Sequence, residues 1–417
     1  MKKDIKIAIV GAGVSGLVAA QVLESQGYYP TVYEASDRAG GRVKTDVVEG
    51  YQLDHGFQVL LDAYPMAQKY LEYKPLELGK FLAGAAVFKN GKEVTLGDPL
   101  RNISLLLPTL LSGIGTWSDK WNIFTLNREL KKKSLEAIFA EPETSTLSYL
   151  KNKGFSDAII NDFFRPFFSG IFLEPNLSTS SRMFQFVYKM FGTGNAVLPK
   201  AGIEAIPKQL LSKLSKTNLV YNTKITICLD GKLVFTDGKE LMVDYTIIAT
   251  EASDLVPNLR NQELLWKSCD TLYFKAKERS IQKPLIGLIT DSEALINNIF
   301  YHSSLSMAHK GVAQLLSVTV VKPHTLNEKE LVQQVKKELA SLCHITDATF
   351  LKRYQIKRAL PDISNIQYEM APSETRLTPK TFLAGDQHLN GSLNAAMLSG
   401  ELAAKAVLEA ITETIVG

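Results

Sequence analysis

The stretch that most constrains the fold is residues 5–34, which carries every part of a nucleotide-binding βαβ unit. A short apolar run leads directly into Gly11-x-Gly13-x-x-Gly16, a helical pattern follows, and a second apolar run ends on Glu34. In such a unit the glycines permit a tight turn and a close approach to a pyrophosphate, and the helix N-terminus offers free N–H groups. The acid at the end of the second strand is placed to accept hydrogen bonds from a ribose. We therefore predict that this stretch binds a dinucleotide.

A second glycine turn follows this unit. The motif Gly40-Gly41-Arg42 is followed by a short strand-like piece and by residues 54–58, DHGFQ. A glycine pair here indicates a second close approach of the backbone to the same ligand, and Arg42 would place its charge on the phosphates. The alternative is a surface turn with a solvated arginine, and the residues by themselves leave both interpretations open.

Composition and charge exclude several other classes of protein. The chain has 417 residues, 45% of them hydrophobic and 22% charged, which is ample for a sizeable core and for two or three domains. The net charge of +4 is too balanced to indicate a nucleic-acid partner. Three cysteines far apart, Cys228, Cys269 and Cys343, suit a reducing compartment and predict neither a disulfide framework nor a zinc site. With no apolar stretch long enough to span a bilayer, we expect a cytoplasmic protein, soluble or peripherally attached to a membrane.

The region from about 80 to 190 has a different character. The run 103–114 is strongly apolar but short, and 117–133 is helical and ends in three lysines. One interpretation is an interfacial patch beside a lipophilic substrate entrance. The other, which we favour, is a buried helix of a cap domain with a solvated end. The aromatic run 163–172 is expected to form core at a helix end, with a minority of its rings lining an apolar pocket.

The middle of the chain predicts two sheets. Strands are expected at 218–228 and 233–236, joined through Asp-Gly turns, and a buried parallel strand at 246–250 would resume the nucleotide-binding sheet. Residues 270–360 indicate four strands, a helix over 328–342 and a fifth strand. Asn327 and Glu330 form a capping box at the start of that helix. This part is predicted to be a second domain with a mixed sheet.

The last part of the chain indicates a ligand longer than a plain nicotinamide cofactor. An apolar strand at 381–383 leads to Gly385-Asp386, and a long amphipathic helix begins at Gly391-Ser392-Leu393-Asn394. A strand, a Gly-Asp pair and a helix N-terminus suit a flavin dinucleotide. The acid would bind a ribityl or phosphate-side hydroxyl, and the positive end of the helix would face the flavin pyrimidine.

Taken together, these motifs make the chain resemble the FAD-dependent superfamily of flavin amine oxidases, protoporphyrinogen oxidases and phytoene desaturases. The match is spread over most of the chain, so it is specific for the superfamily, and it does not identify the substrate. The matching motifs are GAGVSG at 11–16 with Glu34, Gly40-Gly41-Arg42, Asp54-x-Gly56, PKAG at 199–202, the strand 247–250, LAGD at 383–386 and GSLNAAMLSGELAA at 391–404.

The resemblance implies an α/β fold with two discontinuous domains. The Rossmann-type FAD-binding domain with its β-meander would comprise 1–80, 190–258 and 370–417. An α+β substrate domain with a mixed sheet would comprise 81–189 and 259–369. The extended FAD would lie with its adenine near the backbone of Ile225 and its isoalloxazine between the domains. The residues expected to contact it are Gly11, Ala12, Gly13, Val14, Ser15, Gly16, Glu34, Ala35, Gly40, Gly41, Arg42, Gly56, Phe57, Ile225, Gly385, Asp386, Ser392, Leu393 and Asn394.

Departures from the family pattern refine these expectations. Ser392 stands where amine oxidases of the group typically carry an aromatic cage residue, which counts against amine oxidation. Ser36 replaces the arginine that usually follows the ribose-binding acid. The span from Pro361 to Gly385 contains no cysteine, so FAD is expected to be non-covalent. A second nucleotide fingerprint is also missing, which indicates that electrons leave to oxygen, a quinone or another soluble acceptor.

The reaction is expected to be removal of a hydride equivalent from an apolar or aromatic small molecule, in the manner of an oxidase or desaturase. Alternatives are a flavin amine oxidase, a redox-neutral flavin isomerase, and a non-catalytic flavin- or lipid-binding module. Gln58 and His388 are the candidates for a catalytic role. The competing interpretation is a loop amide bonded to backbone for Gln58 and a structural histidine for His388. No metal site is predicted, and the oligomeric state is left open.

Overall fold

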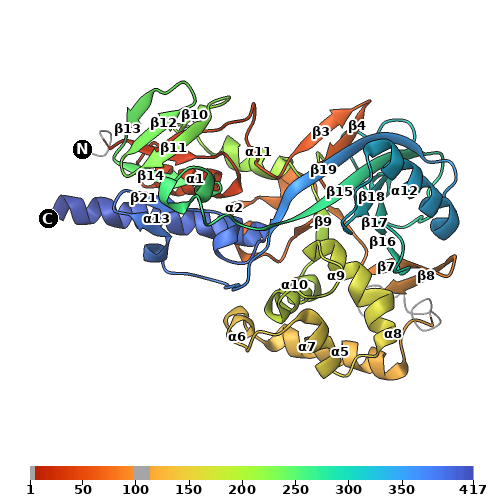
Figure 1. Cartoon of the computed structure of the whole chain (residues 1–417). Coiled ribbons are helices and arrows are strands. Elements are labelled where there is room, and N and C mark those ends of the chain that lie inside the picture. Colours follow the sequence, from red (N-terminus) through yellow and green to blue (C-terminus); the bar gives the residue numbers. More distant parts are fainter. Residues whose placement is uncertain (1–4, 98–112, 417) are drawn as a thin grey trace.

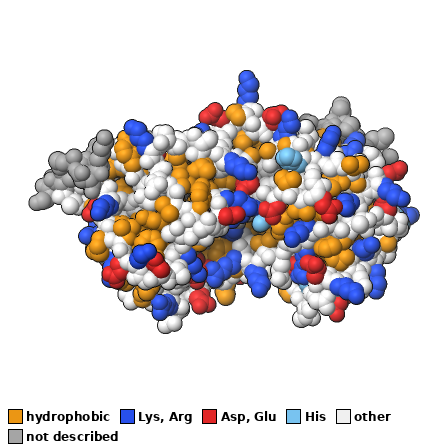
Figure 2. Space-filling view, turned by 90° about the horizontal axis from the view of Figure 1, so that it is seen from above, with side chains coloured by type: hydrophobic (Ala, Val, Ile, Leu, Met, Phe, Trp, Pro, Cys, Tyr) orange, Lys and Arg blue, Asp and Glu red, His pale blue; other side chains and the backbone are white. Residues whose placement is uncertain are grey.

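The computed structural model describes residues 5–97 and 113–416. Figure 1 shows a nucleotide-binding part that contains both termini, a second part built around a large sheet, and a helical lobe beside it. Most of the apolar run expected at 103–114 lies outside the described residues. Side chains of both signs are interspersed on the face seen in Figure 2.

The first large sheet is the predicted nucleotide-binding sheet. Its six strands have the order β10-β2-β1-β14-β21-β20, and all neighbours are parallel except β20 and β21. Helices α1 and α13 pack on one face, and a three-stranded meander packs on the other. The strands are β1 (Ile7–Val10), β2 (Thr31–Tyr33), β10 (Asn218–Val220), β14 (Tyr245–Ile248), β20 (Arg376–Thr378) and β21 (Thr381–Leu383), and the helices are α1 (Val14–Ser25), α11 (Ala205–Ser212) and α13 (Leu393–Val416).

The meander confirms one prediction and corrects another. Strands β11 (Ile225–Leu229), β12 (Lys232–Phe235) and β13 (Glu240–Met242) form the expected antiparallel sheet. The single strand predicted over 218–228 is wrong, since β10 joins the parallel sheet and β11 the meander. The chain turns between them at Asn222, whose φ is 51° and whose N–H donates to Ser36 O at 3.0 Å.

The second large sheet is mixed, as predicted. Its order is β19-β15-β18-β17-β16-β7-β8, with only the β7–β16 pair parallel. Helix α12 (Glu328–Cys343) packs against it and begins with the predicted Asn327/Glu330 capping box. The strands are β7 (Gly84–Lys89), β8 (Lys92–Gly97), β15 (Trp266–Ala276), β16 (Ile286–Ile289), β17 (Ile296–Tyr301), β18 (Gln314–Val320) and β19 (Thr349–Pro361).

Short elements connect the two large sheets. Strand β9 pairs with β5 and β6, and β3 pairs with β4. The elements are β3 (Thr45–Val48), β4 (Tyr51–Asp54), β5 (Leu60–Leu61), α2 (Pro65–Tyr70), α3 (Tyr73–Leu76), β6 (Gly79–Lys80) and β9 (Ala196–Leu198).

The helical lobe confirms the aromatic core and corrects the interpretation of its first helix. Phe164, Phe168 and Phe172 are buried, as expected for core at a helix end. Helix α5, by contrast, exposes Trp117 and Trp121, so the favoured interpretation as a buried helix is wrong for its outer face. No helix among the described residues is long and apolar enough to cross a bilayer. The lobe contains α5 (Trp117–Lys132), α6 (Leu135–Phe139), α7 (Thr146–Asn152), α8 (Asp157–Ile159), a π-helical turn (Ile160–Phe164), α9 (Arg165–Phe172) and α10 (Ser181–Thr193).

Candidate cofactor and substrate site

The glycine turn lies at the carboxyl edge of the parallel sheet. Because β1, β14 and β21 are parallel neighbours, the segments that follow them meet at this edge. Gly11 donates its N–H to Tyr33 O at 2.8 Å and has a φ of 104°. A Cβ added there would lie 2.9 Å from Ala249 O, so the turn has room only for glycine.

Two glycine turns form an open cradle at the N-terminus of α1. Gly40 donates its N–H to Ala12 O at 2.9 Å, and a Cβ added to Gly41 would lie 3.2 Å from the Cα of Gly13. A Cβ added to Gly13 would meet only the Cα of Gly41, at 3.9 Å. This space beside backbone N–H groups and the positive end of a helix fits a pyrophosphate. Within the cradle segment Val14 and Ser15 are buried in α1, and a Cβ added to Gly16 would lie 2.1 Å from Gly11 O.

The acid that follows β2, Glu34, is held in place by three hydrogen-bond donors. Glu34 accepts the N–H of Ala12 at 2.8 Å through one carboxylate oxygen, and the N–H and hydroxyl of Ser36 at 2.9 and 2.7 Å through the other. Ser36 therefore orients Glu34, where the resembled family has an arginine. Ala35 is exposed beside it. Ile225 is buried at the start of β11 among meander side chains, so its backbone is the part available to a ligand.

An ion pair at this site joins an N-terminal motif to a C-terminal one. The guanidinium of Arg42 pairs with the carboxylate of Asp386, which is 4% exposed. Arg42 also donates to Ala359 O at 3.1 Å and lies over the ring of Trp266, 5.2 Å from its centroid. The structure thus brings the glycine-pair turn against the Gly385-Asp386 segment, as the motifs predict.

The N-terminus of α13 is partly capped by the side chain of Ser392, the residue before the helix. The Ser392 hydroxyl accepts the N–H of Ala395 at 3.0 Å and donates to Asn390 Oδ1 at 2.7 Å. Asn394 Oδ1 accepts the N–H of Met66 at 3.0 Å, and Leu393 is half-buried. The Ser392 cap removes one of the N–H groups that the sequence suggested would face a ligand.

The polar candidates are tied into the surrounding structure. Gln58 donates its side-chain N–H groups to Arg42 O and His55 O, at 2.9 and 2.8 Å, so this amide is bonded to backbone. Burial lowers the pKa of His388, which keeps its imidazole neutral near pH 7. His55 Nε2 lies 2.8 Å from Asp46 Oδ2, and the His55 ring lies 4.5 Å from the ring of Tyr354, tilted by 32° to it. The described residues contain no cluster of potential metal ligands.

An aromatic wall, which the sequence interpretation missed, lies beside the DHGFQ motif. We define the wall as Phe57, Phe81, Phe300 and His302. The ring centroid of Phe300 lies 5.4 Å from that of Phe57, 4.5 Å from that of Phe81 and 5.2 Å from that of His302. Burial lowers the pKa of His302 to about 3, and its Nε2 lies 2.9 Å from Ser317 Oγ, so the wall is uncharged. Phe300 lies on β17 (Ile296–Tyr301) and His302 begins the short turn after it, so no local pattern in the sequence indicated the wall.

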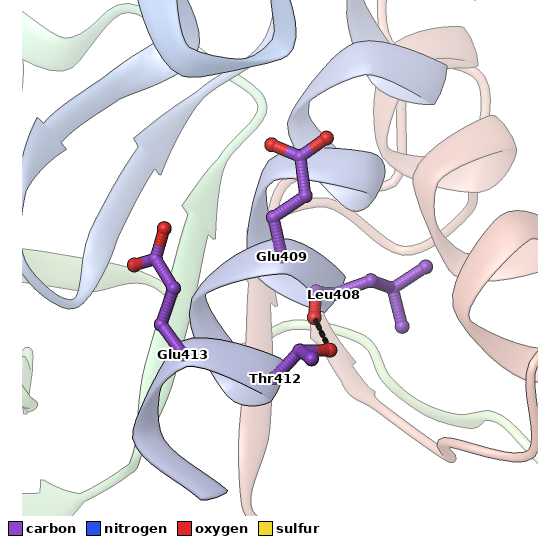
Figure 3. Close-up of a pocket in the computed structure, with 4 residues that line it drawn as sticks. All are labelled: Leu408, Glu409, Thr412 and Glu413. Carbon is purple, nitrogen blue, oxygen red and sulfur yellow. Dashed lines mark hydrogen bonds between the residues drawn. The ribbon is translucent and has the colours of Figure 1, made fainter. Parts of the chain in front are cut away.

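Depressions in the described surface include one beside the helical lobe and one on α13. A cleft of about 430 Å³ between the helical lobe and the ends of β15 and β19 is lined by Lys267, Asp362, Ile363 and several hydroxyls. Ile363 also lies within 3.9 Å of the Cβ position of Gly391, so this cleft adjoins the loop before α13. The other depression, on the outer side of α13, is lined by Leu408, Glu409, Thr412 and Glu413 (Figure 3). It is built from a late part of the helix and includes none of the predicted site residues.

The buried Asp54 predicts a specific pH dependence of stability. Burial raises the pKa of Asp54 from 3.8 to about 6, and this outweighs the hydrogen bonds from Thr45 Oγ1 and the Ile203 N–H. A carboxyl whose folded pKa is raised loses its contribution to stability as the pH rises through that value. Between about pH 4 and pH 7 the wild-type chain should lose about 3 kcal/mol of unfolding free energy relative to Asp54→Asn, from about two pKa units.

Urea unfolding of both proteins at the two pH values measures this difference. Asp46 also affects stability through its pKa. Burial raises this pKa, but hydrogen bonds from His55, Tyr354 and Arg38 outweigh burial and lower it to about 2. The effect of Asp46 on stability therefore falls at lower pH, and it is the same in both proteins. If the unfolding free energies of wild type and Asp54→Asn changed in parallel with pH, the raised pKa of Asp54 would be contradicted.

Comparison with known proteins identifies the family. The family model described as flavin-containing amine oxidoreductase matches residues 14–408. Over 154 residues the chain is 44% identical to the L-amino-acid oxidase BmooLAAO-I of Bothrops moojeni, covering 36% of this chain and 29% of that protein. Over 169 residues it is 31% identical to the chloroplastic/mitochondrial protoporphyrinogen oxidase 2 of Arabidopsis thaliana, covering 40% and 32%.

A solved structure extends the similarity to the whole fold. The CLA-producing fatty acid isomerase from P. acnes superposes with a TM-score of 0.71 at 16% identity, covering 96% of this chain and 98% of that one. At this identity the similarity shows the fold alone. The matches to the two curated relatives span about a third of the length of each.

Proposed function

Because the chain belongs to the family of flavin-containing amine oxidoreductases, we propose that it is an FAD-dependent oxidoreductase that removes a hydride equivalent from a lipophilic small molecule. Bound FAD would accept that hydride equivalent and pass the electrons to oxygen or a quinone-type acceptor. The segments 1–80, 190–258 and 370–417 would hold the cofactor, and 81–189 and 259–369 would hold the substrate. We place the protein in the cytoplasm.

The geometry of the cradle supports the assignment of the cofactor residues. Gly13 and Gly41 leave space for a pyrophosphate, Glu34 is oriented for a ribose, and Arg42 meets Asp386 at the same edge of the sheet. In this assignment Arg42 neutralises phosphate charge and Asp386 accepts from a hydroxyl of the chain that links phosphate to ring. We propose that FAD is bound non-covalently, as is typical of the family.

The observation that carries the choice of substrate is the aromatic wall. Phe57 belongs to a motif on the cofactor side, whereas Phe300 lies on β17 of the second sheet, so the wall joins the two parts of the molecule. Phe300 and His302 are buried, 0% and 2% exposed, whereas Phe57 and Phe81 are half-buried, so the accessible surface of the wall consists of phenyl rings. Apolar rings exclude water and favour a lipophilic substrate. Ser392, which cannot supply cation–π alignment, weighs against an amine.

An anaerobic titration of the holoprotein tests the proposal. Absorbance of the flavin bands is followed on addition of amines, polyenes, porphyrinogens and quinols, and we expect bleaching by an apolar class. Phe81→Ser should raise the half-saturating concentration of that substrate about tenfold, since an apolar contact is worth about 1.5 kcal/mol. Phe350→Ser, the same change at a half-buried ring outside the wall, should leave it unchanged.

Other outcomes of this titration would overturn the proposal in distinct ways. Bleaching by amines with peroxide release on aeration would identify an amine oxidase. Conversion of a substrate by reduced holoprotein without net bleaching would identify an isomerase. A flavin that none of the four classes reduces, in a protein that binds them, would indicate a non-catalytic binding module.

A further inference from the structure

The outer face of α5 carries an unusual line of side chains. The first five are spaced by three or four residues and the last follows directly, which places all of them within about 100° of one another, because an α-helix turns about 100° per residue. We call this line the α5 stripe. It consists of Trp117, Trp121, Phe124, Arg128, Lys131 and Lys132.

The first half of the stripe is aromatic and exposed. Trp117, Trp121 and Phe124 are 75%, 65% and 43% exposed, and they are three of the eight large hydrophobic side chains exposed among the described residues. The rings of Trp121 and Phe124 lie 5.7 Å apart, and Lys120 Nζ lies 4.8 Å from the centroid of Trp117. A contiguous exposed group of rings marks an interaction surface.

The second half of the stripe is cationic. Arg128, Lys131 and Lys132 are exposed, and none of the three forms an ion pair with a described acidic residue. The neighbouring carboxylate of Glu129 is already paired with Lys153 Nζ at 2.6 Å. The positive charge of the stripe is therefore available to an anionic partner.

The helix that presents the stripe is firmly held. Thr116 and Asp119 form a capping box at its start, and Asp119 also accepts from Ser156. Leu126 and Leu130 are buried on the inner side. The Nζ of Lys189 in α10 donates to the carbonyls of residues 130 and 131 at 2.9 and 3.1 Å. The exposed rings are thus a feature of a fixed element.

We propose that the α5 stripe docks on an anionic lipid bilayer. The rings would enter the boundary between headgroups and acyl chains, as tryptophan does at membrane interfaces, and the cations would contact lipid phosphates. A bilayer surface accepts both halves of the stripe, since it offers apolar depth beneath negative charge. Helix α5 lies at the outer edge of the helical lobe (Figure 1), where a flat surface can reach it. The proposal does not depend on the proposed reaction.

Sedimentation of the holoprotein with vesicles tests the charge half of the stripe. We expect binding to phosphatidylglycerol/phosphatidylcholine vesicles and little to phosphatidylcholine alone. Lys131→Glu/Lys132→Glu should lower the partition coefficient at least about 25-fold, because each basic residue near an anionic surface contributes about a fivefold factor. Lys336→Glu/Lys337→Glu makes the same change at two adjacent exposed lysines of α12 and should leave binding nearly unchanged.

The aromatic half is tested with Trp121→Ser/Phe124→Ser against Met242→Ser/Leu265→Ser. The control pair removes side chains that are 63% and 72% exposed elsewhere. Only in the first variant should the vesicle partition coefficient fall roughly tenfold or more. Its FAD content and its unfolding midpoint should stay unchanged. Absence of vesicle binding, or equal losses in both charge variants, would overturn the proposal. A dimer seen by light scattering and abolished by Trp121→Ser/Phe124→Ser, without vesicle binding, would assign the stripe to a second copy instead.

Discussion

Gly13→Val should fold and yet purify without flavin colour. Gly13 has φ −71° and ψ 178°, a conformation that valine adopts readily, and a Cβ there meets only the Cα of Gly41. The added side chain would fill the cradle in which we place the pyrophosphate. If two amide–phosphate hydrogen bonds are lost, at about 1.5 kcal/mol each, the dissociation constant for FAD should rise roughly 100-fold. Titration of apoprotein with FAD, followed by flavin fluorescence, measures it.

The matched control is Gly192→Val, since a Cβ at Gly192 likewise meets no close contact and has no neighbour within 4 Å. Gly192 lies near the end of α10, among residues that form no part of the cradle. This variant should bind FAD as the wild type does. Normal FAD affinity in a folded Gly13→Val protein would refute our placement of the cofactor, whatever the substrate proves to be.

Two glycine-to-alanine substitutions in helices should change stability in opposite directions. Gly400 lies in α13 where it crosses α1, and an added Cβ would lie 2.1 Å from Ser15 O. The obstacle is backbone, so the helices would have to separate, and Gly400→Ala should cost about 3 kcal/mol of unfolding free energy. Gly192→Ala, which has open space, should gain about 0.5–1 kcal/mol from helix propensity.

Urea unfolding of the two apoproteins measures both changes without reference to FAD or substrate. Gly400→Ala should in addition weaken FAD binding, because α13 begins beside Asp386 and α1 begins at the cradle. A stabilised Gly400→Ala protein would show that the two helices do not approach as closely as the structure has them.

How far the sequence predicts this protein depends on whether a feature is local. The turn at Gly11, the capping box of α12 and the Asp-Gly turns of the meander each depend on a few neighbouring residues, and all were predictable. The strand over 218–228 was predicted as one piece because its alternation continues through Asn222. The break there follows from hydrogen bonds of Asn222 and Thr223 to residues 36 and 34, which no local pattern reveals.

The sequence by itself determined the two sheets, the convergence of the Arg42 and Asp386 motifs, and the family, because glycine spacing and hydrophobic period are written in consecutive residues. Only the tertiary structure decided what lies opposite each motif. It joined Phe57 to Phe300 across 243 positions to make the aromatic wall, committed Gln58 to backbone, and turned the rings of α5 outward. Such outcomes depend on which surfaces meet, and the free energy of burial that decides this is a property of the whole packed chain.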